Sequence, residues 1–190
     1  MSWGVAKELS GLAIALLALL SEHPMHPYEM HQLMTERGED RLIKIRAGSL
    51  YHKVSALQNA GLVEIVCTSR EGNRPERTTY RITAEGVEAL QQVVYDRVAK
   101  PVNEYPIFPL AVAELHNLPA EETIQALRSR IVALEIDERT YLAHRDGVQA
   151  RALPQRYYLD LDYSLIMIRA ELTWLRATVD QFQTGELQWQ

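Results

Sequence analysis

The sequence predicts a mostly α-helical fold with one small β-hairpin, divided into two domains at residues 1–100 and 101–190. Three observations lead to this prediction. Apolar residues recur at helical spacing over most of the chain, one segment near residue 70 alternates instead and is interrupted by turn formers, and three prolines fall within residues 101–109. With 190 residues, 47% of them hydrophobic, the chain is long enough to bury a real core.

Two prolines separate the first two predicted helices. Leu9 to Ser21 is apolar nearly all round, so this helix must be covered on more than one side, and we expect Leu16 to contact a second subunit. Its apolar run is about half of what a bilayer crossing needs, so no membrane partner is expected. Pro24 ends the helix, and Pro27, suited to a first helical position, opens a short helix that ends near Gly38.

The next segment, "RAGSLYHKVSALQNAGLV", predicts an amphipathic helix that ends at Gly61. Leu50, Val54 and Leu57 share its inner face. The opposite face is small, polar and uncharged, and it holds Gly48, Ser49, His52, Ser55, Ala56 and Asn59, with Lys53 near its edge and Tyr51 to the side. A helix that enters a DNA major groove needs such a face, because bulk or negative charge would be rejected there.

Positive charge is concentrated around this helix, although the formal net charge of the chain is -5. Residues 41–81 carry eight basic and three acidic side chains, and no carboxylate occurs between Asp40 and Glu64. This distribution predicts a local cationic surface. Lys44 and Arg46, just before the helix, are the expected phosphate contacts, which would add affinity with little sequence discrimination.

A β-hairpin is predicted from Leu62 to Thr83. Its tip, "SREGNRPER", carries turn formers and three arginines, of which we expect at least one to contact DNA: Arg70, Arg74 and Arg77. An arginine-bearing hairpin after an amphipathic helix is typical of the wing of a winged helix-turn-helix domain. Cys67, in a strand interior, is expected to pack rather than to sense redox state. As the only cysteine it excludes an internal disulfide and suits a reducing compartment, the cytoplasm.

Thr83 is the expected N-cap of a further helix, after which the prolines mark the domain boundary. Beyond it the sequence predicts a short helix at 108–117, a long one at 118–145 and a last one after Pro154. The last helix repeats apolar residues at alternating steps of three and four, the pattern of a coiled coil. Because further apolar residues lie off this seam, one face is expected against the preceding helix and one against another protomer. The predicted dimerisation residues are Leu161, Leu165, Ile168, Leu172, Leu175 and Val179, together with Leu16.

Three stretches together resemble the PadR-like family of winged-helix transcriptional regulators: "LALLSEHPMHPYEM", "GSLYHKVSALQNAGLV" and "RTTYRITAEGVEAL". Pro27 departs from the family pattern, which more often has Gly before the residue matching Tyr28. The resemblance implies a homodimeric repressor that binds a partly palindromic operator on double-stranded DNA and is often released by a small molecule. It also implies that Tyr51 supports a phosphate contact, that Ser49 and His52 face the groove, and that the last helix belongs to a dimerisation domain.

Other interpretations remain open at this stage. The main alternative is a protein interaction adaptor whose winged helix no longer binds DNA, and a hydrolase using the histidines is more remote. No catalytic motif is recognised, so an enzyme is not expected, and no cofactor is predicted. His23, His26 and His31 match no tight metal-ligand spacing and are expected to be caps or surface residues. Trp3 and Trp174 are expected to pack at an interface, or alternatively to frame an effector pocket there.

Overall fold

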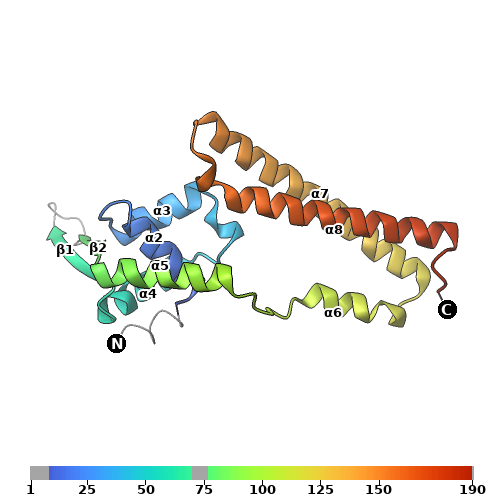
Figure 1. The fold of residues 1–190 in the computed structure, drawn as a ribbon, viewed down its shortest axis with the longest axis horizontal. Helices are drawn as coiled ribbons and strands as arrows, with labels where there is room; N and C mark the ends of the chain where they lie inside the picture. The colour runs from blue at the N-terminus through green and yellow to red at the C-terminus, as the bar shows by residue number, and fades with distance from the viewer. Residues whose placement is uncertain (1–8, 70–76, 190) are drawn as a thin grey trace. The chain divides into compact units, whose positions relative to one another are not determined.

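The structure is a computed structural model that describes residues 9–69 and 77–189. It divides into two compact units, Met1–Asn103 and Glu104–Gln190. In the order of the chain, the first unit contains α2 (Gly11–Leu20), α3 (Pro27–Glu36), the 3-10 turn η1 (Glu39–Arg41), α4 (Ala47–Asn59), the strands β1 (Val63–Ser69) and β2 (Arg77–Ile82), and α5 (Ala84–Ala99) (Figure 1). The described residues therefore form the mostly α-helical fold with a small hairpin that the sequence predicts.

Helix α2 is the centre of the first unit. It packs against α4, α5 and β2, and its side chains at Leu16, Leu17, Leu19 and Leu20 are at most 2% exposed. Leu16 is therefore covered by its own chain, which differs from the expected contact with a second subunit. As expected, α2 is apolar nearly all round because it is covered on several sides. The elements that cover it belong to the same unit and not to a second subunit.

The helices of the first unit begin and end at the proline, glycine and threonine residues that the sequence indicates. Pro27 occupies the first turn of α3, and Gly38 and Gly61 adopt left-handed conformations, with φ of 64° and 73°, just past the ends of α3 and α4. Thr83 caps α5, where its Oγ1 accepts a hydrogen bond from the Gly86 N–H at 3.0 Å.

The two strands pair antiparallel, with Val63 opposite Ile82 and Ile65 opposite Tyr80. Between Ile65 and Cys67 the register shifts by one residue, and beyond this bulge the hairpin leaves the core. Cys67 is exposed, so its predicted packing role is wrong: a two-stranded ribbon without a covering helix leaves both faces open. A short bridge, Met25 to Tyr80 at 2.9 and 3.0 Å, ties the hairpin to the segment before α3.

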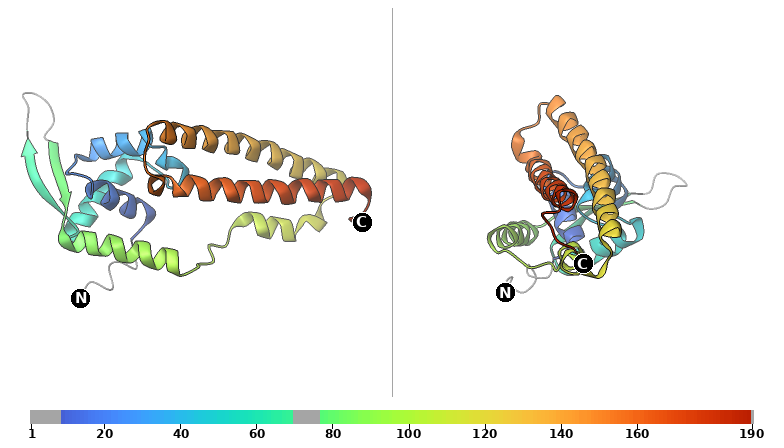
Figure 2. Two further views of the ribbon diagram at one scale, coloured as in Figure 1. Left: turned by 45° about the horizontal axis from the view of Figure 1, so that its top comes forward. Right: turned by 90° about the vertical axis from the view of Figure 1, so that its right-hand side faces the viewer.

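The second unit is built around a long antiparallel helix pair, α7 (Ala120–Ala150) and α8 (Leu159–Thr184), which lie side by side in Figures 1 and 2. The unit also contains α6 (Ile107–Ala113) and the 3-10 turns η2 (Leu115–Asn117) and η3 (Gln155–Tyr157). Leu127 on α7 and Leu175 and Val179 on α8 form its core. Charged pairs border the helix contact, with Arg169 to Glu138 at 2.6 Å, Arg176 to Glu135 at 2.8 Å, and Arg130 bonded to Glu171. None of the helices among the described residues has the length and apolar character to cross a membrane.

Candidate nucleic-acid interface

The inner face of α4 fixes how this helix is presented. Leu50, Val54 and Leu57 are 0%, 1% and 3% exposed and join the core of the first unit. Burial of each such side chain is worth about 1.5–3 kcal/mol. The helix packs on α2 and α3, so its rotation about its own axis is set by these three residues.

The outer face of α4 is open to solvent. Every residue predicted for it is exposed: Gly48, Ser49, His52, Ser55, Ala56 and Asn59. The hydroxyl of Ser49 donates to the Arg46 carbonyl at 2.8 Å and that of Ser55 to the Tyr51 carbonyl at 3.1 Å. Because a hydroxyl rotates, each can turn outward to an external acceptor or donor. The face is therefore small, capable of hydrogen bonding and free of carboxylates.

Four predicted cations surround this face. Lys44, Arg46 and Arg77 are exposed and Lys53 is half-buried at the edge of α4. Within residues 9–69 and 77–189, none of the four forms an ion pair with a carboxylate. Their charge is thus available to an external anion such as a DNA phosphate.

Two other arginines of the first unit form ion pairs within the chain. The guanidinium of Arg37 makes a two-pronged contact with Glu22, at 2.5 and 2.9 Å, and this hydrogen bond lowers the pKa of the Glu22 carboxyl. Arg81 pairs with Glu64 across the hairpin at 2.6 Å. These arginines stabilise the fold locally, whereas the four cations around α4 have no such partner within the described residues.

The N-terminus of α4 adds to the positive character of this surface. Arg46 is its N-cap and offers no side-chain hydrogen bond, and no acidic residue lies in the first turn. The first backbone N–H groups of a helix have no partner within it, and the helix dipole makes this end favourable for an anion. Lys44 and Arg46 therefore lie beside a helix end that itself favours phosphate.

His26 connects the predicted DNA-contacting residues, although the sequence singled it out only as a cap or surface residue. It caps α3, where its Nδ1 accepts a hydrogen bond from the Tyr28 N–H at 3.0 Å. Its ring lies edge-on to that of Tyr51, 6.5 Å away between centroids, and Tyr51 is 48% exposed. Partial burial, and then the charge of Arg77, lower the pKa of His26, while Glu29 opposes the shift. The start of α3 and the side of α4 thus meet at His26, and the charge of Arg77, at the tip end of β2, reaches it. A histidine directly before a helix-opening proline is the sequence signal for this cap.

Of the predicted wing arginines, Arg77 lies at the start of β2, whereas Arg70 and Arg74 fall outside the residues that the structure describes, as does Trp3. The described residues also hold no group of three or more His, Cys, Asp or Glu side chains arranged for a metal ion. His23 instead contacts Glu29 at 3.4 Å.

Comparison with known proteins bears on the unit that carries α4. Residues 16–92 match the profile of the transcriptional regulator PadR-like family. The first unit is therefore similar to this family over these residues. No curated protein sequence matches it.

Solved PadR structures share the fold over nearly the whole chain. Bacillus subtilis PadR crystallised with operator DNA is 17% identical, with a TM-score of 0.75 over 92% of this chain and 98% of that one. The same protein with p-coumaric acid is 17% identical, with a TM-score of 0.73 over 90% and 95%. A PadR-like transcriptional regulator from Bacillus cereus is 16% identical, with a TM-score of 0.66 over 92% and 99%. The winged-helix fold predicted for the first unit is therefore confirmed.

The predicted dimerisation residues of α8 lie largely in the interior of the second unit. Leu161, Leu165, Leu172, Leu175 and Val179 are at most 6% exposed, and Ile168 is half-buried. The 3–4 repeat identifies the buried stripe of α8 correctly, but α7 of the same chain covers it. Apart from Ile168, these side chains therefore have almost no surface left for a second copy.

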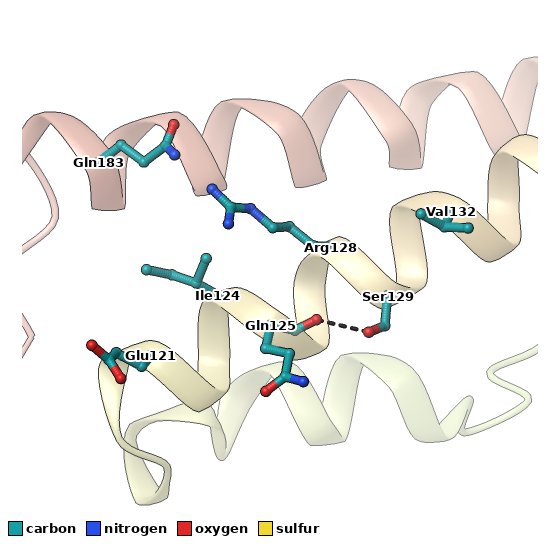
Figure 3. A pocket seen from close by; sticks show the side chains of 7 residues that line it. All are labelled: Glu121, Ile124, Gln125, Arg128, Ser129, Val132 and Gln183. Atoms are coloured by element: carbon teal, nitrogen blue, oxygen red, sulfur yellow. Dashed lines mark hydrogen bonds between the residues drawn. The ribbon is translucent and has the colours of Figure 1, made fainter.

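A shallow hollow of about 450 Å³ lies along α7, near the end of α8. Figure 3 shows Arg128 and Gln183 pointing toward each other above Ile124, with Ser129 bonded to the Gln125 carbonyl at 2.9 Å. Glu121 and Val132 complete the lining. Trp174, expected from the sequence to pack at an interface or alternatively to frame an effector pocket, does not line this hollow and packs edge-on against Phe108 at 6.3 Å.

Proposed function

We propose that this protein is a sequence-specific, DNA-binding transcriptional regulator that represses by binding a palindromic operator as a homodimer. The observation that carries this proposal is the surface of α4. Its inner side chains are locked in the core, its outer face is uncharged and small, and the cations around it have no carboxylate partner among the described residues.

In this role α4 enters the major groove, and Ser49 and His52 contact base edges. Lys44, Arg46 and the N-terminus of α4 contact phosphates, as does Tyr51, while Lys53 borders the groove. The hairpin, through Arg77 and the arginines of its tip at positions 70 and 74, contacts the adjacent backbone or minor groove. Two copies would place two such helices on half-sites about one helical turn apart.

The solved structures support this role at the level of the fold. Bacillus subtilis PadR has been crystallised with operator DNA and with p-coumaric acid. By analogy we include release by a small-molecule effector in the proposal. The proposed activity is binding rather than catalysis, and it places the protein with the DNA in the cytoplasm.

Residues that contact bases can be distinguished from residues that contact phosphates by measuring how each variant binds a set of different duplex sequences. Lys44→Ala and Arg46→Ala are expected to weaken binding to all sequences by a similar factor. Ser49→Ala and His52→Ala are expected to change which sequence is preferred, by about 1–3 kcal/mol at the affected base pair. Arg139→Ala is the matched control, because this exposed arginine lies on α7 of the second unit.

Unchanged duplex binding in all four variants, together with loss of a protein partner, would instead favour the adaptor function.

A further inference from the structure

The first unit holds His26 in place from two sides. The Nδ1 atom of His26 accepts the Tyr28 N–H at 3.0 Å, which caps α3. The preceding residue, Met25, is fully buried, and its backbone exchanges two hydrogen bonds with Tyr80 of β2, at 2.9 and 3.0 Å. The following residue, Pro27, has its φ fixed by the proline ring. His26 is therefore ordered before any ligand binds.

The cap also determines which ring nitrogen of His26 carries a proton. A ring nitrogen that accepts a backbone N–H is itself unprotonated, so in the neutral imidazole the proton lies on the other nitrogen, Nε2. Nε2 makes no hydrogen bond with any residue that the structure describes, and it is not among the buried polar atoms that lack a partner. His26 consequently presents an N–H donor to solvent.

The surroundings of His26 favour the neutral ring. Partial burial and the charge of Arg77 on β2 lower its pKa, while Glu29 of α3 acts in the opposite sense and is itself contacted by His23 at 3.4 Å. Protonation would also turn Nδ1 into a donor, which could no longer accept the N–H that caps α3. Near neutral pH, His26 is therefore an uncharged donor.

The open donor lies beside two residues of the proposed DNA surface. The His26 ring is edge-on to that of Tyr51, with 6.5 Å between the centroids and 73° between the planes. Arg77 is exposed and close enough for its charge to act on His26. Both Tyr51 and Arg77 are proposed to contact the DNA backbone, so the same strand would pass beside the Nε2–H of His26.

We propose that His26 is a further DNA-contacting residue, whose Nε2–H donates a hydrogen bond to a phosphate oxygen beside Tyr51 while the ring stays neutral. This inference rests on the proposed function, because it adds a residue to the same surface. An ordered donor loses little conformational entropy when it binds. Because a neutral donor neutralises no phosphate, it adds affinity without releasing counterions, in contrast to Lys44 and Arg46.

Two substitutions separate the donor of His26 from its cap. The side-chain oxygen of asparagine is as many bonds from Cα as Nδ1 of histidine, and the side-chain nitrogen of glutamine as many as Nε2. His26→Asn therefore keeps a capping acceptor, for which asparagine is well suited, and loses the donor. His26→Gln keeps a donor and loses the cap.

The test measures binding of the full chain to a duplex that the native chain has selected from a random-sequence pool, at pH 7.5 and several salt concentrations. His26→Asn is expected to lower the association constant at least about tenfold, the effect of one hydrogen bond to a charged acceptor. Its slope on logarithmic salt axes should equal that of the native chain. Its Tm should also be native at this pH, since the cap remains.

His26→Gln is expected to show the reverse pattern. Its association constant should stay within about threefold of the native value, because a donor remains near the position of Nε2. Its Tm should fall by about 5 °C, because the cap of α3 is lost. The matched control is His144→Asn, at an exposed histidine of α7 in the second unit, which is expected to change neither binding nor its salt dependence.

Three results would overturn the inference. Native affinity in His26→Asn would show that the donor contacts no phosphate. Affinity that follows the Tm, with a larger loss in His26→Gln than in His26→Asn, would show that His26 acts only through the fold. A less steep salt slope in His26→Asn, or an affinity loss that disappears between pH 7 and pH 8.5, would show that the ring acts as a cation.

The inference and the proposed function fail in different ways. If the native chain binds the duplex and Lys44→Ala weakens that binding, native affinity in His26→Asn contradicts the inference alone. A native chain that binds no duplex at low salt contradicts the proposed function, and the role of His26 with it.

Discussion

Replacing Gly86 by alanine is expected to disrupt the packing between α5 and the hairpin. Gly86 is buried in the first turn of α5, and a β-carbon there would lie 2.1 Å from the Leu62 carbonyl oxygen and 2.7 Å from Cγ1 of Ile82. Real β-carbons essentially never approach other heavy atoms closer than 3.0 Å. The helix and the start of β1 would therefore have to separate by about 1 Å to accommodate the methyl group.

The size of the effect follows from three contributions. Overpacking of this kind costs about 1–3 kcal/mol. The Leu62 carbonyl also accepts the Thr83 N–H at 3.1 Å, so separation strains a hydrogen bond worth about 1 kcal/mol. Replacing glycine by alanine within a helix raises the free energy of unfolding by at most about 1 kcal/mol. The expected net loss is about 2 kcal/mol, which lowers the Tm of the first unit by roughly 10 °C.

Scanning calorimetry with a matched variant tests this reasoning. Gly147→Ala lies in α7 of the second unit, where a β-carbon meets nothing within 4 Å. It is expected to raise stability by about 0.5–1 kcal/mol, since only the helix-propensity gain remains. A Gly86→Ala protein that melts at or above the temperature of the native chain would refute the close packing of α5 on the hairpin.

Three further predictions concern caps, protons and the helix pair. Because the pKa of His26 is lowered in the folded state, the stability it contributes is full above its unfolded pKa of about 6.5 and is lost as pH falls through the lowered folded value. His26→Asn keeps a capping group but cannot titrate, so the difference in Tm between this variant and the native chain should change as pH falls below about 6.5. A difference that stays constant with pH would contradict the lowered pKa of His26. Thr83→Val removes the cap to Gly86 and the hydrogen bond to the Gly61 carbonyl at 2.8 Å, and should lower the free energy of unfolding by about 1–2 kcal/mol in urea titrations; an unchanged urea midpoint would contradict the cap. Leu172→Asp places a charge at a position 1% exposed and should reduce the helical circular dichroism of the second unit, whereas Ala143→Asp, on an exposed face, should not.

Local sequence signals predict much of the first unit. Prolines and glycines punctuate the helices because their backbone preferences act within one or two residues, and Pro27, Gly38 and Gly61 behave accordingly. The spacing of Leu50, Val54 and Leu57 determines the buried side of α4, and therefore also the exposed side. This is why the predicted DNA-facing residues of α4 could be placed without a structure.

Periodicity identifies a buried face but not the element that covers it. Leu16 and Leu172 illustrate the difference: both are buried as the patterns indicate, yet their neighbours belong to the same chain. The pattern of an intramolecular helix pair and that of a dimer seam are the same in sequence. The exposure of Cys67 was missed for a related reason, because alternation indicates a strand and does not show where the strand leaves the core.

Contacts between segments that are distant in the chain could not be predicted from the sequence either. The cluster of Phe108, Arg130, Glu171 and Trp174 joins three helices, and no local pattern connects these residues. The ring contact of His26 with Tyr51 and the effect of the Arg77 charge on the pKa of His26 are of the same kind. Such contacts depend on how the helices are arranged in space.

The central claim is that α4 and its cations bind the DNA backbone and bases, and the salt dependence of duplex binding tests it most directly. The observed association constant of the native chain should fall linearly with salt on logarithmic axes. In the double variant Lys44→Ala, Arg46→Ala the slope should become less steep by about 0.9 for each phosphate that the protein no longer neutralises, or roughly 3–4 for a dimer in which four cations are removed. A native chain that binds no duplex at low salt, or a double variant with the native slope, would contradict the account.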